Sequence, residues 1–146
     1  MHRTRVIALA TLASTALLAA LPNVATADEL KVVNGWISLP IGREDPSLYF
    51  VIQSKSAETQ TLVGATSPRC ESIAIRRTAV VDGQWSSVGM PEGMAVPAGG
   101  AVAFAPRGLF LRMSGAEKFA EGDAVPVELE FASGLKVAFT ATAKDE

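Results

Sequence analysis

The sequence is 146 residues long, with 13 basic and 15 acidic side chains, one cysteine and one histidine. The near balance of charge and the lack of a basic tract argue against nucleic acid as a partner. A single cysteine excludes an internal disulfide, and a single histidine, His2, leaves little scope for histidine catalysis or an imidazole metal site.

The first 27 residues have the pattern of a secretory signal peptide. A basic start, MHRTR, precedes the uncharged apolar stretch 6–21, and Ala25-Thr26-Ala27 has the small-residue pattern of a cleavage site. Cleavage after Ala27 removes His2 and leaves one domain, residues 28–146, with 11 basic and 15 acidic side chains. An uncleaved membrane anchor is the alternative, although the apolar stretch is short for a span. We expect a periplasmic or secreted protein with no membrane span after cleavage.

The remaining chain has the pattern of short strands separated by turns. In 71–81, Ile73 and Ile75 alternate with Arg76, which predicts a strand with one apolar face. Asp82-Gly83 predicts a hairpin turn after it. Further strands are expected within 30–39, 46–54, 61–68, 95–106, 108–115 and 120–143, the last as two strands joined at Ser133-Gly134. No long amphipathic helix is evident, so the prediction is an all-β, single-domain sandwich or barrel.

The segment Gly108–Met113, GLFLRM, combines large apolar side chains with an arginine. As a strand it places Phe110 and Arg112 on one face and Leu111 and Met113 on the other. An arginine among apolar side chains is costly unless it has a partner or reaches water. The segment therefore presents a functional question: what does Arg112 contact?

Soft metal ligands are the remaining candidates for chemistry. Cys70 is either a small packed hydrophobe or a reactive or metal-binding thiol. Met90 and Met94 flank a Pro-Glu-Gly loop, and Met113 is the other methionine of residues 28–146. Thioether sulfur suits Cu(I), whereas methionines also fill gaps in protein cores. Both interpretations of the four residues stay open.

The order of features along nearly all of residues 28–146 resembles the PCu(A)C (PCuAC) family of periplasmic copper chaperones. The matching motifs are VVNGWISLP (32–40), PSLYFVIQS (46–54), DGQW (82–85), VPAGGAVAFAPRG (96–108), EGDAVPVELEF (121–131) and GLKVAFTA (134–141). The resemblance implies a cupredoxin-like β-sandwich or barrel. It also implies Cu(I) capture, with periplasmic protein partners in copper delivery for respiratory oxidase assembly.

The copper site of the family, two histidines and two methionines, is not retained at the matching positions. The family's ligand positions fall on Arg76, near Ser87, and on Phe110 and Arg112. None of these side chains is a copper ligand, so the resemblance implies a degenerate metal site. Two guanidinium groups repel a metal ion and attract an anion. We expect an anion- or partner-binding patch of Arg76, Phe110 and Arg112; the alternative is that both arginines pair with acidic neighbours on a solvated face.

Two functions from different classes follow from these residues. The first is a non-catalytic binding or accessory module with no cofactor, in which no metal is expected at the family positions. The second is a Cu(I) chaperone that uses an atypical site of Met90, Met94, Met113 and Cys70. An enzyme is not expected, because residues 28–146 lack a histidine and show no nucleophile beside a base.

Overall fold

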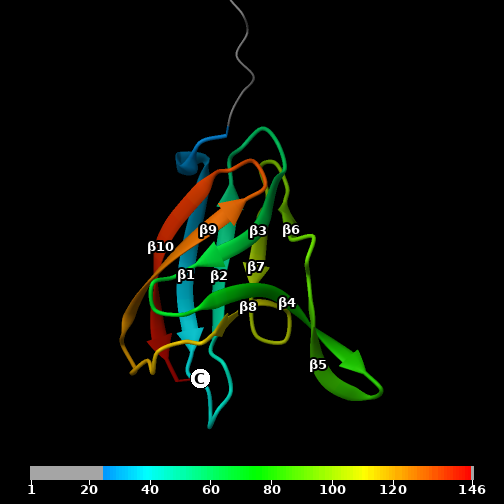
Figure 1. Ribbon diagram of the computed structural model, residues 1–146. Helices are drawn as coiled ribbons and strands as arrows, with labels where there is room; N and C mark the ends of the chain where they lie inside the picture. The colour runs from blue at the N-terminus through cyan, green and yellow to red at the C-terminus, as the bar shows by residue number, and fades with distance from the viewer. Residues whose placement is uncertain (1–24, 146) are drawn as a thin grey trace, which may run out of the picture.

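The protein is an all-β barrel in the computed structural model, which describes residues 25–145 (Figure 1). The strands are β1 (Leu30–Ser38), β2 (Ser47–Ser54), β3 (Gln60–Thr66), β4 (Ser72–Val81), β5 (Gln84–Gly89), β6 (Met94–Val96), β7 (Ala101–Phe104), β8 (Leu109–Ser114), β9 (Ala124–Phe131) and β10 (Lys136–Lys144). A single 3-10 turn, η1 (Ala27–Glu29), precedes them. The prediction of an all-β, single-domain fold is confirmed. The predicted signal peptide lies almost entirely outside the described residues.

Seven strands close the barrel in the order β4-β8-β2-β1-β10-β9-β3, and β3 returns to β4 through the Ala65–Ile73 pair. The neighbours pair antiparallel except β1 and β10, which are parallel. β5 continues the sheet beyond β4, while β6 and β7 pair with β3 and β2. In the span 25–145, no helix is long and apolar enough to cross a membrane.

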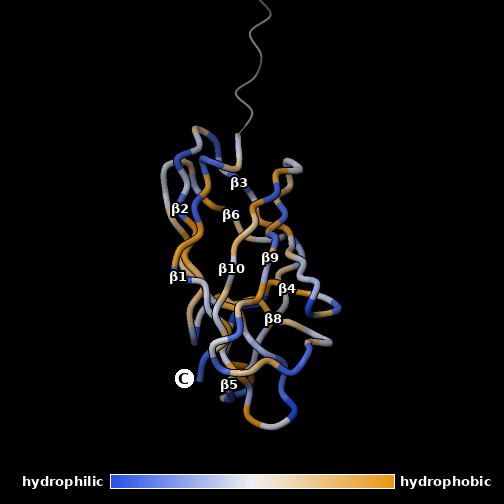
Figure 2. Tube along the Cα trace, turned by 90° about the vertical axis from the view of Figure 1, so that its left-hand side faces the viewer, coloured by the Kyte–Doolittle hydropathy of each residue, from blue (hydrophilic) through white to orange (hydrophobic). Residues whose placement is uncertain are grey.

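The core is formed by the alternate residues of the strands that face inward. Leu48, Phe50 and Ile52 of β2 are almost completely buried, as are Leu111 and Met113 of β8. Burial of such large apolar side chains is the main source of stability for the barrel. Apolar stretches lie along the strands, and hydrophilic stretches lie mostly in the connecting loops (Figure 2).

Two local features shape the sheet: a bulge in β1 and the tight turn after β4. A bulge between Val33 and Trp36 accommodates Gly35, which lies so close to Phe139 that an added Cβ would be 2.9 Å from the ring. The predicted hairpin turn is confirmed: Asp82 and Gly83 both have positive φ angles, 52° and 76°, as a type I′ turn requires. This turn joins β4 and β5 into a hairpin that extends away from the barrel (Figure 1).

Candidate functional site

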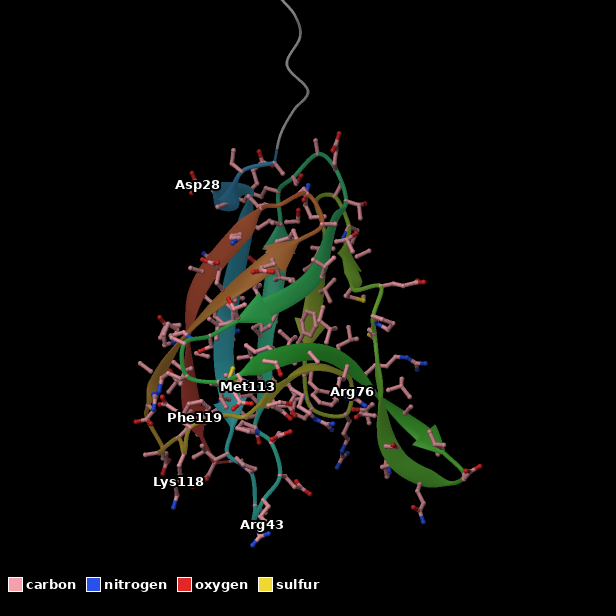
Figure 3. The ribbon with its side chains drawn as sticks, viewed as in Figure 1. Asp28, Arg43, Arg76, Met113, Lys118 and Phe119 are labelled. Atoms are coloured by element: carbon pink, nitrogen blue, oxygen red, sulfur yellow. The ribbon has the colours of Figure 1, made fainter. Side chains whose placement is uncertain are left out.

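The candidate site lies where the β4–β5 hairpin leaves the barrel, on the outer face of β4, β5 and β8. Figure 3 shows Arg76 at this junction and Met113 within the barrel. The register places Arg76 of β4 opposite Phe110 of β8 and opposite Gly89 of β5. The predicted alternation in GLFLRM is observed, because Leu111 and Met113 face the core while Phe110 and Arg112 lie on the outer face of the sheet. On that face Phe110 is itself buried, at 8% exposure, and Arg112 is half-buried.

Two arginines converge on one serine at this junction. The Nε of Arg76 donates to the Oγ of Ser87 at 2.9 Å, and its Nη2 donates to the backbone oxygen of Ser87, also at 2.9 Å. The Nη2 of Arg112 donates to the same Oγ at 3.3 Å. The Arg112 guanidinium also lies over the Phe110 ring, 5.9 Å from its centroid. We call Arg76, Ser87, Phe110 and Arg112 the arginine cluster.

The charges of the arginine cluster have no carboxylate partners within residues 25–145. The ion pairs found there involve other groups: Arg69 pairs with Glu117 at 2.9 Å and with Asp123 at 3.5 Å, and Lys136 pairs with Glu128 at 3.8 Å. Among residues 25–145 neither Arg76 nor Arg112 forms an ion pair with an acidic neighbour, and their side-chain hydrogen bonds go to Ser87. Two half-buried cations beside one hydroxyl leave positive charge that an anion can neutralise.

A shallow, open cavity of about 490 Å³ covers the arginine cluster. Besides the cluster, its lining comprises Ser47, Tyr49, Thr78, Trp85 and Ser86. The lining is rich in hydroxyl groups and contains no acidic side chain. Inspection of the sequence did not identify these five residues as site residues. Two signals point to two of them: Trp85 belongs to the DGQW hairpin, and Thr78 follows Arg76 by two residues, which places both on one face of β4.

The soft-ligand candidates do not line this cavity. Met113 has no exposed surface and belongs to the core, with Ile73 of β4 as its cross-strand neighbour. Met94 lies on β6 opposite Leu62, and Met90 follows β5 and donates its backbone N–H to Ile75. Cys70, Met90 and Met94 are partly buried against the core. No cluster of three or more His, Cys, Asp or Glu side chains able to hold a metal occurs among the described residues.

Alkylation of Cys70 is expected to be slow near neutral pH. Burial raises the pKa of the Cys70 thiol above its ordinary value, so the reactive thiolate is a smaller fraction at a given pH. Iodoacetamide should react with the folded protein more slowly than with free cysteine at pH 8, and the rate should rise on going to pH 10. Mass spectrometry of the alkylated protein measures both rates. A Cys70 rate at pH 8 equal to that of free cysteine contradicts the raised pKa.

Solved structures that share this fold include three PCuAC-type proteins. A copper-bound PCuAC domain from PmoF2 is 18% identical with a TM-score of 0.64, and the match covers 81% of this chain and 94% of that domain. An apo PCuAC domain from PmoF1 is 21% identical with a TM-score of 0.65, covering 81% and 95%. The Cu(I)-bound solution structure of DR1885 from Deinococcus radiodurans is 24% identical with a TM-score of 0.63, covering 92% and 86%.

At these identities the likeness is one of fold, and it confirms the cupredoxin-like β-barrel that the sequence motifs implied. No curated protein matches the sequence significantly. Residues 30–143, which include nearly every strand residue described above, match the family described as "Putative lipoprotein LpqE-like". The chain is a member of the LpqE-like family.

Proposed function

We propose that this protein is an exported, non-enzymatic binding module that holds an anionic group at the arginine cluster. The observation that carries the proposal is the convergence of Arg76 and Arg112 on Ser87, with no carboxylate beside them in residues 25–145. Guanidinium groups bind carboxylate and phosphate oxygens through paired N–H donors. The Ser87 hydroxyl accepts from both arginines, so its own proton is available to an incoming anion.

Copper does not fit the side chains at this position. Cu(I) prefers thioether, thiolate and imidazole ligands, whereas the arginine cluster offers two cations, one hydroxyl and one phenyl ring. The positive charges also oppose a bound cation. We therefore infer a degenerate metal site on a PCuAC-type fold, with no metal cofactor there.

A Cu(I) chaperone is the second candidate, because a structure with the same fold is a copper-bound PCuAC domain. Its ligands would be Met90, Met94, Met113 and Cys70, with copper passed to a periplasmic protein in oxidase assembly. The complete burial of Met113 in the core weighs against the chaperone, because a buried thioether is not accessible to bind or release a copper ion.

A competition titration for Cu(I) against a colorimetric chelator, under reducing conditions, separates the two candidates. Binding of one equivalent that is lost when Met90 and Met94 are changed to leucine supports the chaperone.

Export follows from the proposed signal peptide, with cleavage after Ala27 and a periplasmic or secreted location. The family description names lipoproteins, but the only cysteine of this sequence is Cys70, inside the barrel domain and not near residue 27. Because the residue after the predicted cleavage site is Asp28, we infer that no lipid is attached to a cysteine at that position.

Substitution of either arginine is expected to weaken anion binding. Titration of the protein with sodium phosphate and with sodium acetate at low ionic strength should shift the amide NMR signals of Arg76, Ser87 and Arg112, since screening is weak there. In Arg76→Gln and in Arg112→Gln the apparent affinity should fall at least about tenfold, equivalent to roughly 1.4 kcal/mol.

Arg77→Gln is the matched control for this titration. Arg77 is the next residue of β4, is exposed, and lies on the opposite face from Arg76. Its replacement removes the same charge from the same strand and should change the affinity less than about twofold, because the Arg77 side chain points to the other face of the sheet and does not line the cavity. Equal losses in Arg77→Gln and Arg76→Gln, or no shift at Ser87 in the unaltered protein, would refute anion binding at the cluster.

A further inference from the structure

The β4–β5 hairpin carries exposed apolar side chains beyond the barrel. Trp85 is 72% exposed and Val80 is 60% exposed, and the strand register places them directly opposite each other. Most large apolar residues of the barrel are buried, so a tryptophan and a valine paired in solvent form an unusual surface. The proposed anion site needs only the arginines and Ser87, so it does not account for this pair, although Trp85 lines the same cavity.

The apolar pair and the arginine cluster share one face of the sheet. Successive residues of a strand point to opposite faces, so Arg76, Thr78 and Val80 lie together, as do Ser87 and Trp85 across from them. Both guanidinium groups reach Ser87, which is two residues from Trp85, or about 7 Å along an extended strand. The face therefore presents two guanidinium groups at the barrel and an apolar pair toward the tip. We call it the hairpin face.

The shape of the cavity favours a large partner over a small anion. Sites for small molecules enclose most of the ligand surface, whereas this cavity is shallow and open to solvent. A single exposed ion pair contributes little free energy, so an anion held only by the arginines would bind weakly. Apolar contact with Trp85 and Val80 supplies the additional burial, and tryptophan and arginine are the residues that contribute most often to protein interfaces.

The free edge of β5 is a poor docking position, because Arg76 already occupies one of its backbone acceptors. The Thr78 N–H donates to the Gly108 carbonyl oxygen, on the β8 side of β4. Thr78 and its cross-strand neighbour Ser87 therefore exchange no backbone hydrogen bonds, and the N–H and C=O of Ser87 point away from β4, toward the free edge of β5. The Arg76 Nη2 occupies the Ser87 carbonyl oxygen there. An added strand would have to displace this bond, whereas a segment lying across the hairpin face leaves it in place.

We propose that the hairpin face docks an acidic segment of another protein, in which a carboxylate lies about 7 Å from a large apolar side chain. The carboxylate binds at Arg76 and Arg112, and the apolar side chain packs on Trp85 and Val80. Charge complementarity decides the partner, since the cavity lining contains two arginines and no acidic residue. This inference rests on the anion site of the proposed function and identifies the class of its ligand as protein.

The test begins with selection of random 16-residue peptides, displayed on phage, against the immobilised protein. Selected peptides are then synthesised and titrated against Trp36→Phe protein, in which Trp85 is the only tryptophan. Enriched peptides should combine Asp or Glu with a large apolar residue, and binding should shift the Trp85 emission to shorter wavelength as the indole leaves water. Replacing the acidic residue of a selected peptide by its amide should weaken binding at least about tenfold.

The chain offers closely matched control variants for the apolar half of the face. Val80 and Val81 are adjacent valines, 60% and 47% exposed, on opposite faces of the hairpin. Peptide affinity, measured by calorimetry, should fall at least about tenfold in Trp85→Ser and in Val80→Ser, and less than about twofold in Val81→Ser. Phosphate binding should be unchanged in Val80→Ser and Val81→Ser, because neither valine lines the cavity over the arginines.

Each other outcome overturns the inference. It fails if no peptide is enriched, if the enriched peptides lack acidic residues, or if Val80→Ser and Val81→Ser weaken binding equally. Self-association of the unaltered protein that disappears in Trp85→Ser, measured by sedimentation, assigns the face to a second copy of the chain instead. Phosphate binding that persists while peptide binding is absent leaves the proposed function intact, whereas loss of both removes the anion site itself.

Discussion

Replacing Met113 with alanine is expected to destabilise the protein by about 2–5 kcal/mol, the usual range for truncation of a buried large aliphatic side chain. Met113 has no exposed surface and lies in the barrel core with Leu111 and Phe50. Alanine at this position leaves a cavity that the surrounding strands fill only in part. Urea unfolding followed by circular dichroism measures the change in the free energy of unfolding.

Met113→Leu is the control that separates packing from metal binding. Leucine has a similar volume, so the loss of stability should stay below about 1.5 kcal/mol, although the thioether is gone. Under the proposed function, Cu(I) competition is the same for Met113→Leu and the unaltered protein. A stable Met113→Leu protein that loses a copper equivalent present in the unaltered protein would show that the thioether is a ligand and contradict its assignment as a core residue.

A copper site is expected to appear when the four family ligands are placed on the arginine cluster. The variant carries Arg76→His, Ser87→Met, Phe110→His and Arg112→Met, and we expect it to bind Cu(I) at least about 100-fold more tightly than the unaltered protein, or roughly 2.7 kcal/mol. The substitutions remove two cations and add two imidazoles and two thioethers, which suit Cu(I). Chelator competition measures the affinity and the stoichiometry.

The geometry of the cluster is the reason for this expectation. Arg76 lies opposite Phe110 in the β4–β8 register, and both arginines reach the Ser87 hydroxyl. Side chains at these positions therefore meet at one point although they come from three strands. Affinity should fall below about pH 6.5, because histidine must be neutral to bind a metal.

Retaining Arg112 in the otherwise complete graft provides the control. This triple variant lacks one thioether and keeps one cation, so its Cu(I) affinity should be well below that of the fourfold variant. Equal affinities for the two variants would place the copper elsewhere in the protein. A correctly folded fourfold variant with no copper binding would show that the four positions do not correspond to the family site.

Much of the fold was predictable because it depends on local patterns. Alternation of Ile73 and Ile75 with Arg76 indicated a strand with one buried face, and Asp82-Gly83 indicated a hairpin because only a few residue types favour positive φ angles. The prediction that Phe110 and Arg112 lie on the same face of their strand followed from the same alternation. These signals require only neighbouring residues, so the sequence alone was sufficient.

The contacts of the candidate site were less predictable because they join distant segments. Ser87 was located only approximately from the sequence, whereas the β4–β5 register fixes it opposite Thr78 and within reach of Arg76. The partner of Arg112 was left open between acidic neighbours and a bound anion. Ser87, which precedes Arg112 by 25 positions, holds its guanidinium through pairing of β4 with both β5 and β8.

The sequence by itself determined the β-class of the chain, the hairpin, and the absence of histidine from residues 28–146, since composition and local periodicity carry that information. Only the tertiary structure decided that Met113 is a core residue and that two arginines meet at Ser87. It also decided that Trp85 and Val80 lie on the same face as the arginines. Closure of the barrel and the register between strands set these contacts, and both depend on the packing of residues far apart in the chain.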